Sequence, residues 1–349
     1  MKIAIHYSEG DFFSKHWIDY CDEKKINYIL VDAYSNSIIK KLEDVDMFLW
    51  HHSNYDYRDA LFAKQLLYSL NKKGILVFPN FNTNWHFDDK VGQKYLLEAI
   101  SAPLIPSYVF YKKSEALKWI NETSFPKVFK LRGGSGSSNV KLIRTKSEAK
   151  KIINKAFGKG FEQFDRFTHL RYRIENFRSG KEGFSAIIKG FIRLFIASEY
   201  SNNTSREKGY VYFQDFIPNN DSDIRVIVIK NRAFAIKRMV RKNDFRASGS
   251  GNIIYLKDNI NLDCIKIAFE VNKKIGSQST AFDFVFDHNG LPKIVEISYG
   301  FVPGAYHKCE GYWDDKMNWH NKQFNPSKWM IENLIEDFKI SKLYSTNLV

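Results

Sequence analysis

The chain of 349 residues is long enough for two or three packed units, and no apolar run of about eighteen residues occurs, so we expect no transmembrane helix. The first residues are typical of a strand and not of a signal region, and the three cysteines are far apart, which together predict free thiols in a reducing, cytoplasmic setting. The net charge of +14 favours anionic ligands, but the lysines are scattered along the chain, so we expect no nucleic-acid partner.

The first part of the chain alternates strand and helix signals. Strands are predicted over 2–7, 28–31, 47–50 and 75–79, with helices over 13–25 and 59–70. This rhythm predicts a parallel sheet with helices on its faces, and ligands of such sheets bind beyond the carboxyl ends of the strands. His51, His52 and Asn54 follow the third strand and are therefore candidates for substrate contact, with a structural role as the alternative.

A domain boundary is predicted after a helix over 88–99. Two X-Pro pairs, at Pro103 and Pro106, disfavour helix there. A strand–loop–strand unit over 125–144 and a helix over 147–156 follow. We therefore expect three domains, covering residues 1–102, 103–210 and 211–349.

The last third is rich in strand signals. The apolar runs 211–217, 224–229 and 233–240 have tight connections, which predicts one antiparallel sheet. A helix over 262–275 follows, then a hairpin of 281–286 with 293–297 around Asn289-Gly290, and a final helix over 326–340.

A loop of small residues follows the strand that ends in Lys130. Glycine and serine from Gly133 to Ser138 would let backbone N–H groups approach an anion, and Lys130 would add positive charge beside it. The loop lacks the Gly-Lys-Ser/Thr ending of a P-loop. A hairpin loop that binds nothing is the alternative.

Two acids of the predicted hairpin, Asp283 and Glu296, can face the same side of the sheet. Paired carboxylates repel one another unless a cation joins them, and Mg²⁺ is commonly held by one or two carboxylates together with substrate phosphates. Exposed strand acids are the alternative, but Glu296 stands among apolar residues, where an unpaired charge is costly.

Arginines form a third candidate group. Arg225 follows Asp223 by two residues, Arg238 follows on the next strand, and Arg246 precedes a second glycine-rich stretch. Guanidinium forks suit carboxylates and phosphates. A solvated basic face is the alternative.

Taken in chain order, these pieces resemble the ATP-grasp superfamily of ligases, in particular the glutathione-synthetase and ribosomal-protein-S6-modifying type. The resemblance extends over roughly Asp88 to Ser298 and rests on seven ordered motifs. It implies a mixed α/β (α+β) ATP-grasp fold with a Rossmann-like domain before the grasp. Two residues depart from the family pattern, because Asp215 replaces the commoner Glu and Ser298 replaces Asn.

The resemblance also implies ATP and Mg²⁺ as cofactors, with Mn²⁺ as an alternative metal. The implied nucleotide contacts are Lys90, Lys130, Gly133, Gly134, Ser135, Gly136, Ser137, Gln214, Asp215, Phe216, Ile217 and Asp223. The implied catalytic residues are Arg225, Arg238 and Arg246, and the implied metal ligands are Asp283, Glu296 and Ser298.

The implied reaction joins a carboxylate to an amine through an acyl phosphate, with small, anionic substrates as partners and a homodimer left open. A small-molecule kinase and a nucleotide-binding protein with impaired catalysis are the alternatives. The aromatic segment 299–320 should lie near the site as a lid or acceptor pocket, with zinc on His307, Cys309 and His320 as a minor alternative.

Overall fold

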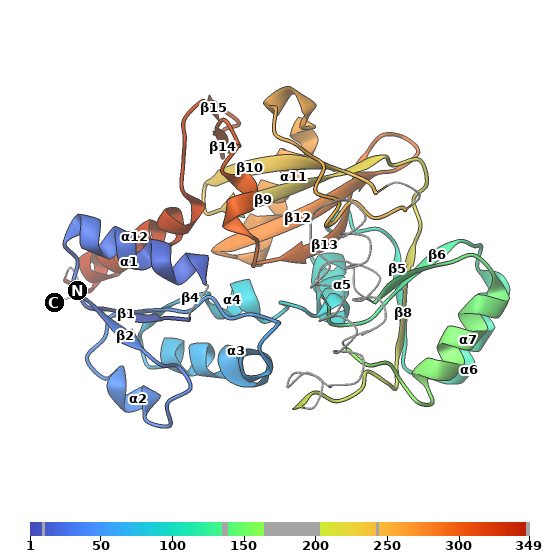
Figure 1. Cartoon of the computed structure of the whole chain (residues 1–349), viewed down its shortest axis with the longest axis horizontal. Helices are drawn as coiled ribbons and strands as arrows, with labels where there is room; N and C mark the ends of the chain where they lie inside the picture. The colour runs from blue at the N-terminus through green and yellow to red at the C-terminus, as the bar shows by residue number, and fades with distance from the viewer. Residues whose placement is uncertain (9–10, 135–138, 164–202, 242–243, 347–349) are drawn as a thin grey trace, which may run out of the picture.

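The computed structural model describes residues 1–8, 11–134, 139–163, 203–241 and 244–346. The described residues form three sheets, which occupy different parts of the molecule (Figure 1). None of the described helices is both long and apolar enough to cross a membrane.

The first sheet has four parallel strands in the order β2-β1-β3-β4. Its elements are β1 (Ile3–His6), α1 (Phe12–Lys24), β2 (Tyr28–Val31), α2 (Ile38–Lys41), β3 (Met47–Leu49), α3 (Tyr57–Lys72), β4 (Leu76–Phe78) and α4 (Phe81–Asn84). Alternate residues of β1 face opposite sides, since Ile3 and Ile5 pack with Trp17 of α1 while Ala4 joins the cluster under α3. The predicted parallel sheet with helices on its faces is confirmed.

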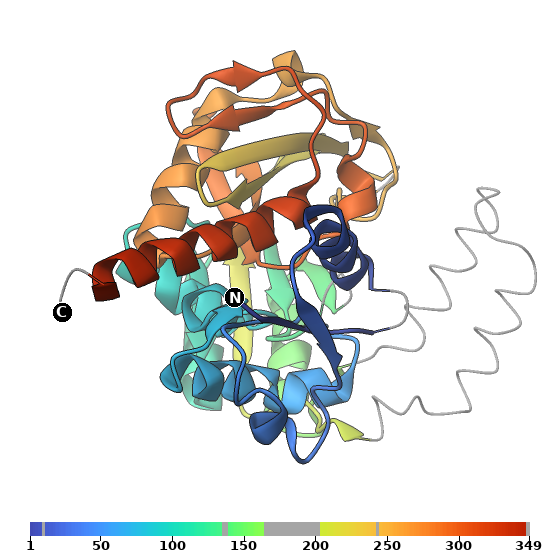
Figure 2. The same cartoon turned by 90° about the vertical axis from the view of Figure 1, so that its left-hand side faces the viewer.

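The C-terminal helix α12 (Pro326–Thr346) covers the same face of this sheet as α1 (Figure 2). Ile331 and Leu334 belong to the same buried cluster as Trp17. The Trp17 indole N–H also donates to the carbonyl oxygen of Ser327 at 3.0 Å. The N-terminal sheet and the last helix therefore share one hydrophobic core.

The second sheet is antiparallel, in the order β5-β8-β6-β7, and two helices cover one of its faces. Its elements are β5 (Ser107–Phe110), α6 (Lys113–Glu122), β6 (Lys127–Lys130), β7 (Val140–Ile143), α7 (Lys146–Ala156) and β8 (Val211–Asp215). Helix α5 (Lys90–Ala99) precedes them, and its Leu97 packs in the core of the third sheet. The prediction that 211–217 joins one sheet with 224–229 and 233–240 is wrong, because β8 pairs with β5 and β6. Pro218 and Asn219, whose φ is 65°, turn the chain out of this sheet.

The third sheet has the order β13-β12-β9-β10-β14-β15, with β11 also paired to β10. Its elements are β9 (Ser222–Ile229), β10 (Arg232–Met239), β11 (Ile253–Ile254), a 3₁₀ turn (Lys257–Asn259), α11 (Leu262–Ile275), β12 (Ser279–Phe286), β13 (Pro292–Ser298), a second 3₁₀ turn (Pro303–Tyr306), β14 (Tyr312–Asp314) and β15 (Trp319–His320). The predicted hairpin of β12 and β13 is confirmed, whereas β14 and β15 were not predicted from the sequence. The division into three domains stays a prediction.

Candidate active site

A cavity of about 940 Å³ lies where elements of all three sheets meet. Most of the predicted site residues line it: Lys90, Lys130, Gly134, Gln214, Asp215, Phe216, Ile217, Asp223, Arg225, Arg238, Arg246, Asp283, Glu296 and Ser298. Gly133 is not among the lining residues, and Ser135, Gly136 and Ser137 lie outside the described residues. The structure thus brings together side chains that are spread over more than half of the chain.

Lys130 lies at the end of β6 and faces the cavity. Val128 and Lys130 line the cavity, whereas Phe129 between them packs under α6 and α7. The ammonium group is buried, and its Nζ lies 3.5 Å from the carbonyl oxygen of Val295. Burial lowers the pKa of Lys130 to about 8, because the charged form loses its water, although Glu296 opposes this shift.

Lys90 is the first residue of α5. The Asp89 carboxylate caps this helix by accepting the Gly92 N–H at 2.9 Å. The Nζ of Lys90 donates to the carbonyl oxygen of Gly134 at 2.7 Å and lies 3.3 Å from Oε1 of Glu296. Helix α5 therefore supplies an ammonium group to both the glycine-rich loop and a carboxylate of β13.

Asp88 holds the start of the glycine-rich loop. Its Oδ1 accepts the Gly134 N–H at 2.8 Å, and a Cβ at Gly133 would come within 3.1 Å of its Oδ2. A side chain at 133 would therefore require Asp88 to shift by a few tenths of an ångström. Burial raises the pKa of Asp88. No motif of the sequence marks Asp88 as a loop anchor.

Gln214 and Asp215 end β8, and both side chains have partners within the protein. The Gln214 amide donates to the Val295 carbonyl oxygen at 3.3 Å, and Asp215 Oδ1 lies 2.5 Å from the Nζ of Lys127 on the neighbouring strand. Phe216 follows them and contacts Phe245 edge-on, with 5.8 Å between ring centroids. The two polar side chains therefore brace this segment of the cavity wall.

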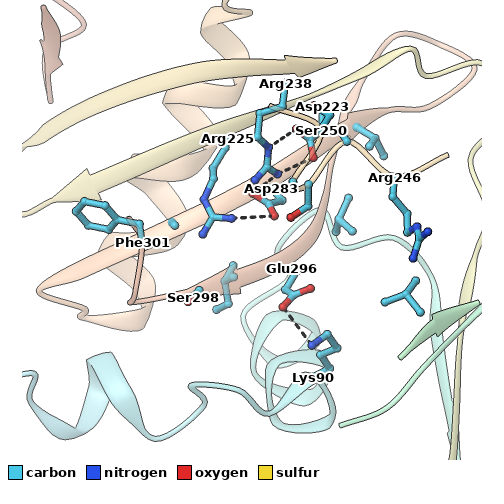
Figure 3. A pocket seen from close by; sticks show the side chains of 18 of the residues that line it. Lys90, Asp223, Arg225, Arg238, Arg246, Ser250, Asp283, Glu296, Ser298 and Phe301 are labelled. Carbon is cyan, nitrogen blue, oxygen red and sulfur yellow. Dashed lines mark hydrogen bonds and ion pairs between the residues drawn. The ribbon is translucent and has the colours of Figure 1, made fainter. Parts of the chain in front are cut away.

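Asp283 of β12 and Glu296 of β13 are direct cross-strand partners, and both line the cavity (Figure 3). Asp283 Oδ2 lies 3.4 Å from Nη1 of Arg225, and its Oδ1 lies 3.0 Å from Nη2 of Arg238. Burial raises the pKa of Asp283, but the two guanidinium groups more than offset this and hold it below its usual range. The hairpin register thus brings two carboxylates into one cationic setting.

Arg238 and Asp223 form a bidentate pair. The Nε–Oδ1 distance is 2.7 Å and the Nη2–Oδ2 distance is 2.6 Å. Only 7% of Arg238 and 9% of Asp223 is exposed, so the pair is buried. The nucleotide contact expected for Asp223 stays a prediction, because its carboxylate already has a partner.

Arg246 and Ser298 line the cavity while their polar atoms are engaged nearby. The Arg246 guanidinium forks onto Asp244, with 2.7 Å between Nη2 and Oδ2, and lies apart from Asp283 in Figure 3. The Ser298 hydroxyl donates to the Gly300 carbonyl oxygen at 3.0 Å and accepts the Gly300 N–H at 3.2 Å. Ser298 therefore shapes the turn after β13, and its metal contact stays a prediction.

Two histidines that follow β3 reach the cavity from the N-terminal sheet. His51 Nδ1 lies 3.3 Å from Oδ1 of Asp11, which also caps α1, and the His51 ring stacks on Phe13 at 4.0 Å. His52 is buried, and burial lowers its pKa well below the usual value. The sequence analysis did not identify Asp11, because only the parallel pairing of β1 with β3 brings the two loops together.

The segment after β13 contributes Phe301 and Tyr306 to the cavity, as expected for part of the aromatic tail. The zinc alternative is wrong, since the described residues contain no group of three or more His, Cys, Asp or Glu that could hold a metal ion. His320 instead pairs with Asp314 at 2.9 Å, and the Cys309 thiol is buried.

The cavity lining is balanced in charge although the chain carries a net +14. Its described ionic side chains are five cationic and five anionic: Lys90, Lys130, Arg225, Arg238, Arg246, Asp88, Asp215, Asp223, Asp283 and Glu296. The basic excess of the chain therefore lies elsewhere.

The sequence matches no protein-family model and no curated protein. The structure is similar to a RimK-domain ATP-grasp protein from Sphaerobacter thermophilus (14% identity, 85% of this chain and 90% of that one, TM-score 0.51). It is also similar to D-alanine–D-alanine ligase from Bacillus anthracis (14% identity, 98% of this chain and 99% of that one, TM-score 0.56). A third similar structure is the ATP-grasp ligase PsnB complexed with minimal precursor, Mg and ADP (12% identity, 97% of this chain and 98% of that one, TM-score 0.54). The chain therefore has the ATP-grasp fold.

Proposed function

We propose that the chain is an ATP-dependent ligase that joins a carboxylate to an amine through an acyl phosphate. The observation that carries this proposal is the convergence of Lys90, Lys130, Asp283 and Glu296 in one cavity of this fold. Two ammonium groups complement the charge of a polyphosphate, and two carboxylates complement the divalent cation that accompanies it.

The carboxylate pair fits Mg²⁺, with Mn²⁺ as the alternative. Asp283 and Glu296 are cross-strand partners that both line the cavity, so two hard oxygen ligands for the ion lie side by side. The arginines beside Asp283 and Lys90 beside Glu296 would then pair with phosphate oxygens. Asp283 and Glu296 would hold the ion, with Ser298 as a third candidate. The bound ion would neutralise phosphate charge.

The cationic side chains would take different parts of the substrates. Lys90 and Lys130 would hold phosphate oxygens, with the loop amides of 133–138 beside them, while residues 214–217 would hold adenine. Arg225 and Arg238 would face the transferred phosphoryl group because both contact Asp283. Arg246 would bind the carboxylate of the acceptor. Such catalysis needs positioning and charge neutralisation, and it requires no side-chain nucleophile.

In the proposed reaction a substrate carboxylate oxygen attacks the γ-phosphorus of ATP, and the bond to the ADP oxygen breaks. The amine nitrogen then attacks the acyl carbon of the acyl phosphate, so that an amide forms and phosphate and a proton leave. The likeness to D-alanine–D-alanine ligase and to PsnB with its precursor supports an amino-acid or peptide carboxylate. Negative charge on the substrates beyond the reacting carboxylate stays a prediction, because the charge-balanced cavity does not favour it.

The test is a panel of amino acids and short peptides, incubated with Mg·ATP in the presence and absence of amine acceptors. We expect ADP and phosphate release that depends on both a carboxylate and an amine, with an amide product seen by mass spectrometry. Turnover without amine that yields a stable phosphorylated product would instead make the protein a kinase. Binding of Mg·ATP by calorimetry without turnover on any pair would make it a nucleotide-binding protein with impaired catalysis.

Nucleotide affinity should weaken as the pH rises through the pKa of Lys130, which burial lowers to about 8. In the free protein this ammonium loses its charge near pH 8, about two units below an ordinary lysine, and a neutral amine cannot hold phosphate charge. The Kd for ATP, measured by calorimetry, should therefore rise between about pH 7 and pH 9, and binding at the upper end should take up protons. Lys130→Arg should remove this rise because arginine stays charged; an equal rise in that variant would contradict the assignment.

A further inference from the structure

The positive charge of the chain is concentrated in one stretch, contrary to the predicted scattering of its lysines. Residues 111–160 contain thirteen Lys and Arg against three Asp and Glu, a net +10 of the total +14. This stretch forms β6 and β7, which are strands of the second sheet, and α6 and α7, which lie on the outer side of that sheet in Figure 1. Lys127 and Lys130 of this stretch are buried, so the excess on the surface comes from the other basic residues of the stretch.

The lysines of α6 and α7 point outward because the opposite sides of these helices are buried. Ala116 and Ile120 of α6 and Ala149 and Ile153 of α7 pack on the sheet in one hydrophobic cluster. All ten Lys and Arg of 112–118 and 141–159 are exposed, and we call this surface the basic face. Only two acids, at 115 and 148, are exposed within the same ranges.

Little within the described part of the protein neutralises the basic face. One ion pair is formed there among the described residues, between Lys112 Nζ and Glu115 Oε1 at 3.1 Å, and both side chains are more than half exposed. An exposed pair of this kind contributes little. Lys155 also lies 4.6 Å from the ring centre of Phe161. The face therefore offers its charge to a partner.

The basic face does not take part in the cavity. Alternate side chains of β6 lie on opposite sides of the second sheet: Val128 and Lys130 face the cavity, and Phe129 faces the helices. The basic face lies beyond those helices, so a partner bound to it would leave the cavity open. Nucleotide binding does not explain the positive charge of the basic face, because the ionic side chains that line the cavity are balanced in charge.

Composition and shape point to the kind of partner. Nine of the ten basic side chains are lysines, whose compact charges suit diffuse attraction and lack the fork that arginine offers to individual phosphates. Tyr111 is the one exposed aromatic side chain among the described residues of 111–160, so the face has no platform for stacked bases. Most of the face is the outer surface of the two helices α6 and α7.

We propose that the basic face docks the protein on an anionic lipid surface. Clustered lysines on the outside of helices are attracted electrostatically to anionic lipid headgroups. This attraction extends about 10 Å at moderate salt. The described helices do not span a membrane, so the contact is peripheral and reversible. Docking is independent of the proposed ligase reaction.

Sedimentation of the full chain with phosphatidylcholine vesicles, with and without phosphatidylglycerol, tests the proposal. We expect binding to the anionic vesicles only, with release at high salt. A variant with Lys146, Lys150, Lys151 and Lys155 changed to Glu should bind at least about tenfold more weakly. Its turnover in solution should match that of the unchanged protein, since none of the four lines the cavity.

The matched control changes Lys40, Lys41, Lys72 and Lys73 to Glu. These lysines are also exposed, and the net charge changes by the same amount, but they lie on α2 and α3 of the N-terminal sheet or next to them. The control should keep its vesicle binding, and circular dichroism should show that both variants are folded. Lys→Gln at the four α7 positions should give an intermediate loss.

Three results would overturn the proposal: no binding of the unchanged protein to anionic vesicles, equal losses in both sets of variants, or binding to a duplex oligonucleotide without binding to vesicles. The last result would assign the face to nucleic acid. Failure of the ligase assay would not bear on this test, because docking needs no nucleotide.

Discussion

Glu296→Ala should abolish ATP-dependent turnover and leave the protein folded. Glu296 is the cross-strand partner of Asp283 and one of the two carboxylates proposed to hold the metal ion. Removing a group that stabilises transferred charge lowers kcat by about a hundredfold or more. The fold should survive because Lys90 keeps its 2.7 Å hydrogen bond to Gly134 and the Glu296 side chain is 32% exposed. ADP release and urea unfolding measure the two effects.

Ser298→Ala is the matched comparison, two residues farther along β13. Its hydroxyl is engaged with the backbone of Gly300, so a much smaller loss of turnover is expected. Lys130→Ala should behave like Glu296→Ala. Full activity in either Glu296→Ala or Lys130→Ala would refute the assignment of the cavity as the active site.

Arg238→Ala should destabilise the protein by about 3–5 kcal/mol, the usual cost of removing one partner from a buried ion pair. Its guanidinium pairs with Asp223 at 2.6–2.7 Å and lies 3.0 Å from Asp283. Alanine would leave Asp223 buried without its bidentate partner, while Asp283 would keep only Arg225 at 3.4 Å. The free energy of unfolding, measured in urea, gives the magnitude.

Arg246→Ala provides the contrast. Its ion pair with Asp244 is also bidentate, but the side chains are 26% and 17% exposed, so the loss should be no more than about 1 kcal/mol. Activity should still fall in this variant if Arg246 binds the acceptor. Equal destabilisation by the two substitutions would show that burial does not govern the Arg238 pair, and a double variant with Asp223→Asn and Arg238→Met should recover part of the lost stability.

The hairpin of β12 and β13 is the part of the site that the sequence predicts best. Asn289-Gly290 marks the turn, and alternating apolar residues mark the strands, so the residue pattern alone is enough to place Asp283 and Glu296 on one face. The register shift between Asp283 and Phe284 was not foreseen, because a bulge depends on packing and leaves no clear pattern in the residues.

The pairing of Arg238 with Asp223 could also have been predicted. A tight turn at Lys230, whose φ is 54°, sets Arg232 opposite Ile229, and the same register carries Arg238 opposite Asp223. Both residues were expected to contact ligands, although this register lets them satisfy one another. A buried charged side chain is usually paired with an opposite charge within the protein.

Other features depend on long-range packing and had no local signal. The residues that form β8 have the composition of any buried strand. Their pairing with β5 and β6 is determined by the tertiary path of the chain and not by their own sequence. The contact between Asp11 and His51 arises in the same way, from the parallel neighbours β1 and β3. Hydrophobic pattern specifies that a strand is buried but not which strand lies beside it.

The packing of α12 on the N-terminal sheet has a consequence for synthesis of the protein. One face of that sheet is covered by α1 together with Ile331 and Leu334 of α12, which are translated long after the sheet. The first sheet therefore remains without part of its core until α12 has left the ribosome. In the meantime its apolar face is exposed to chaperones and to premature association.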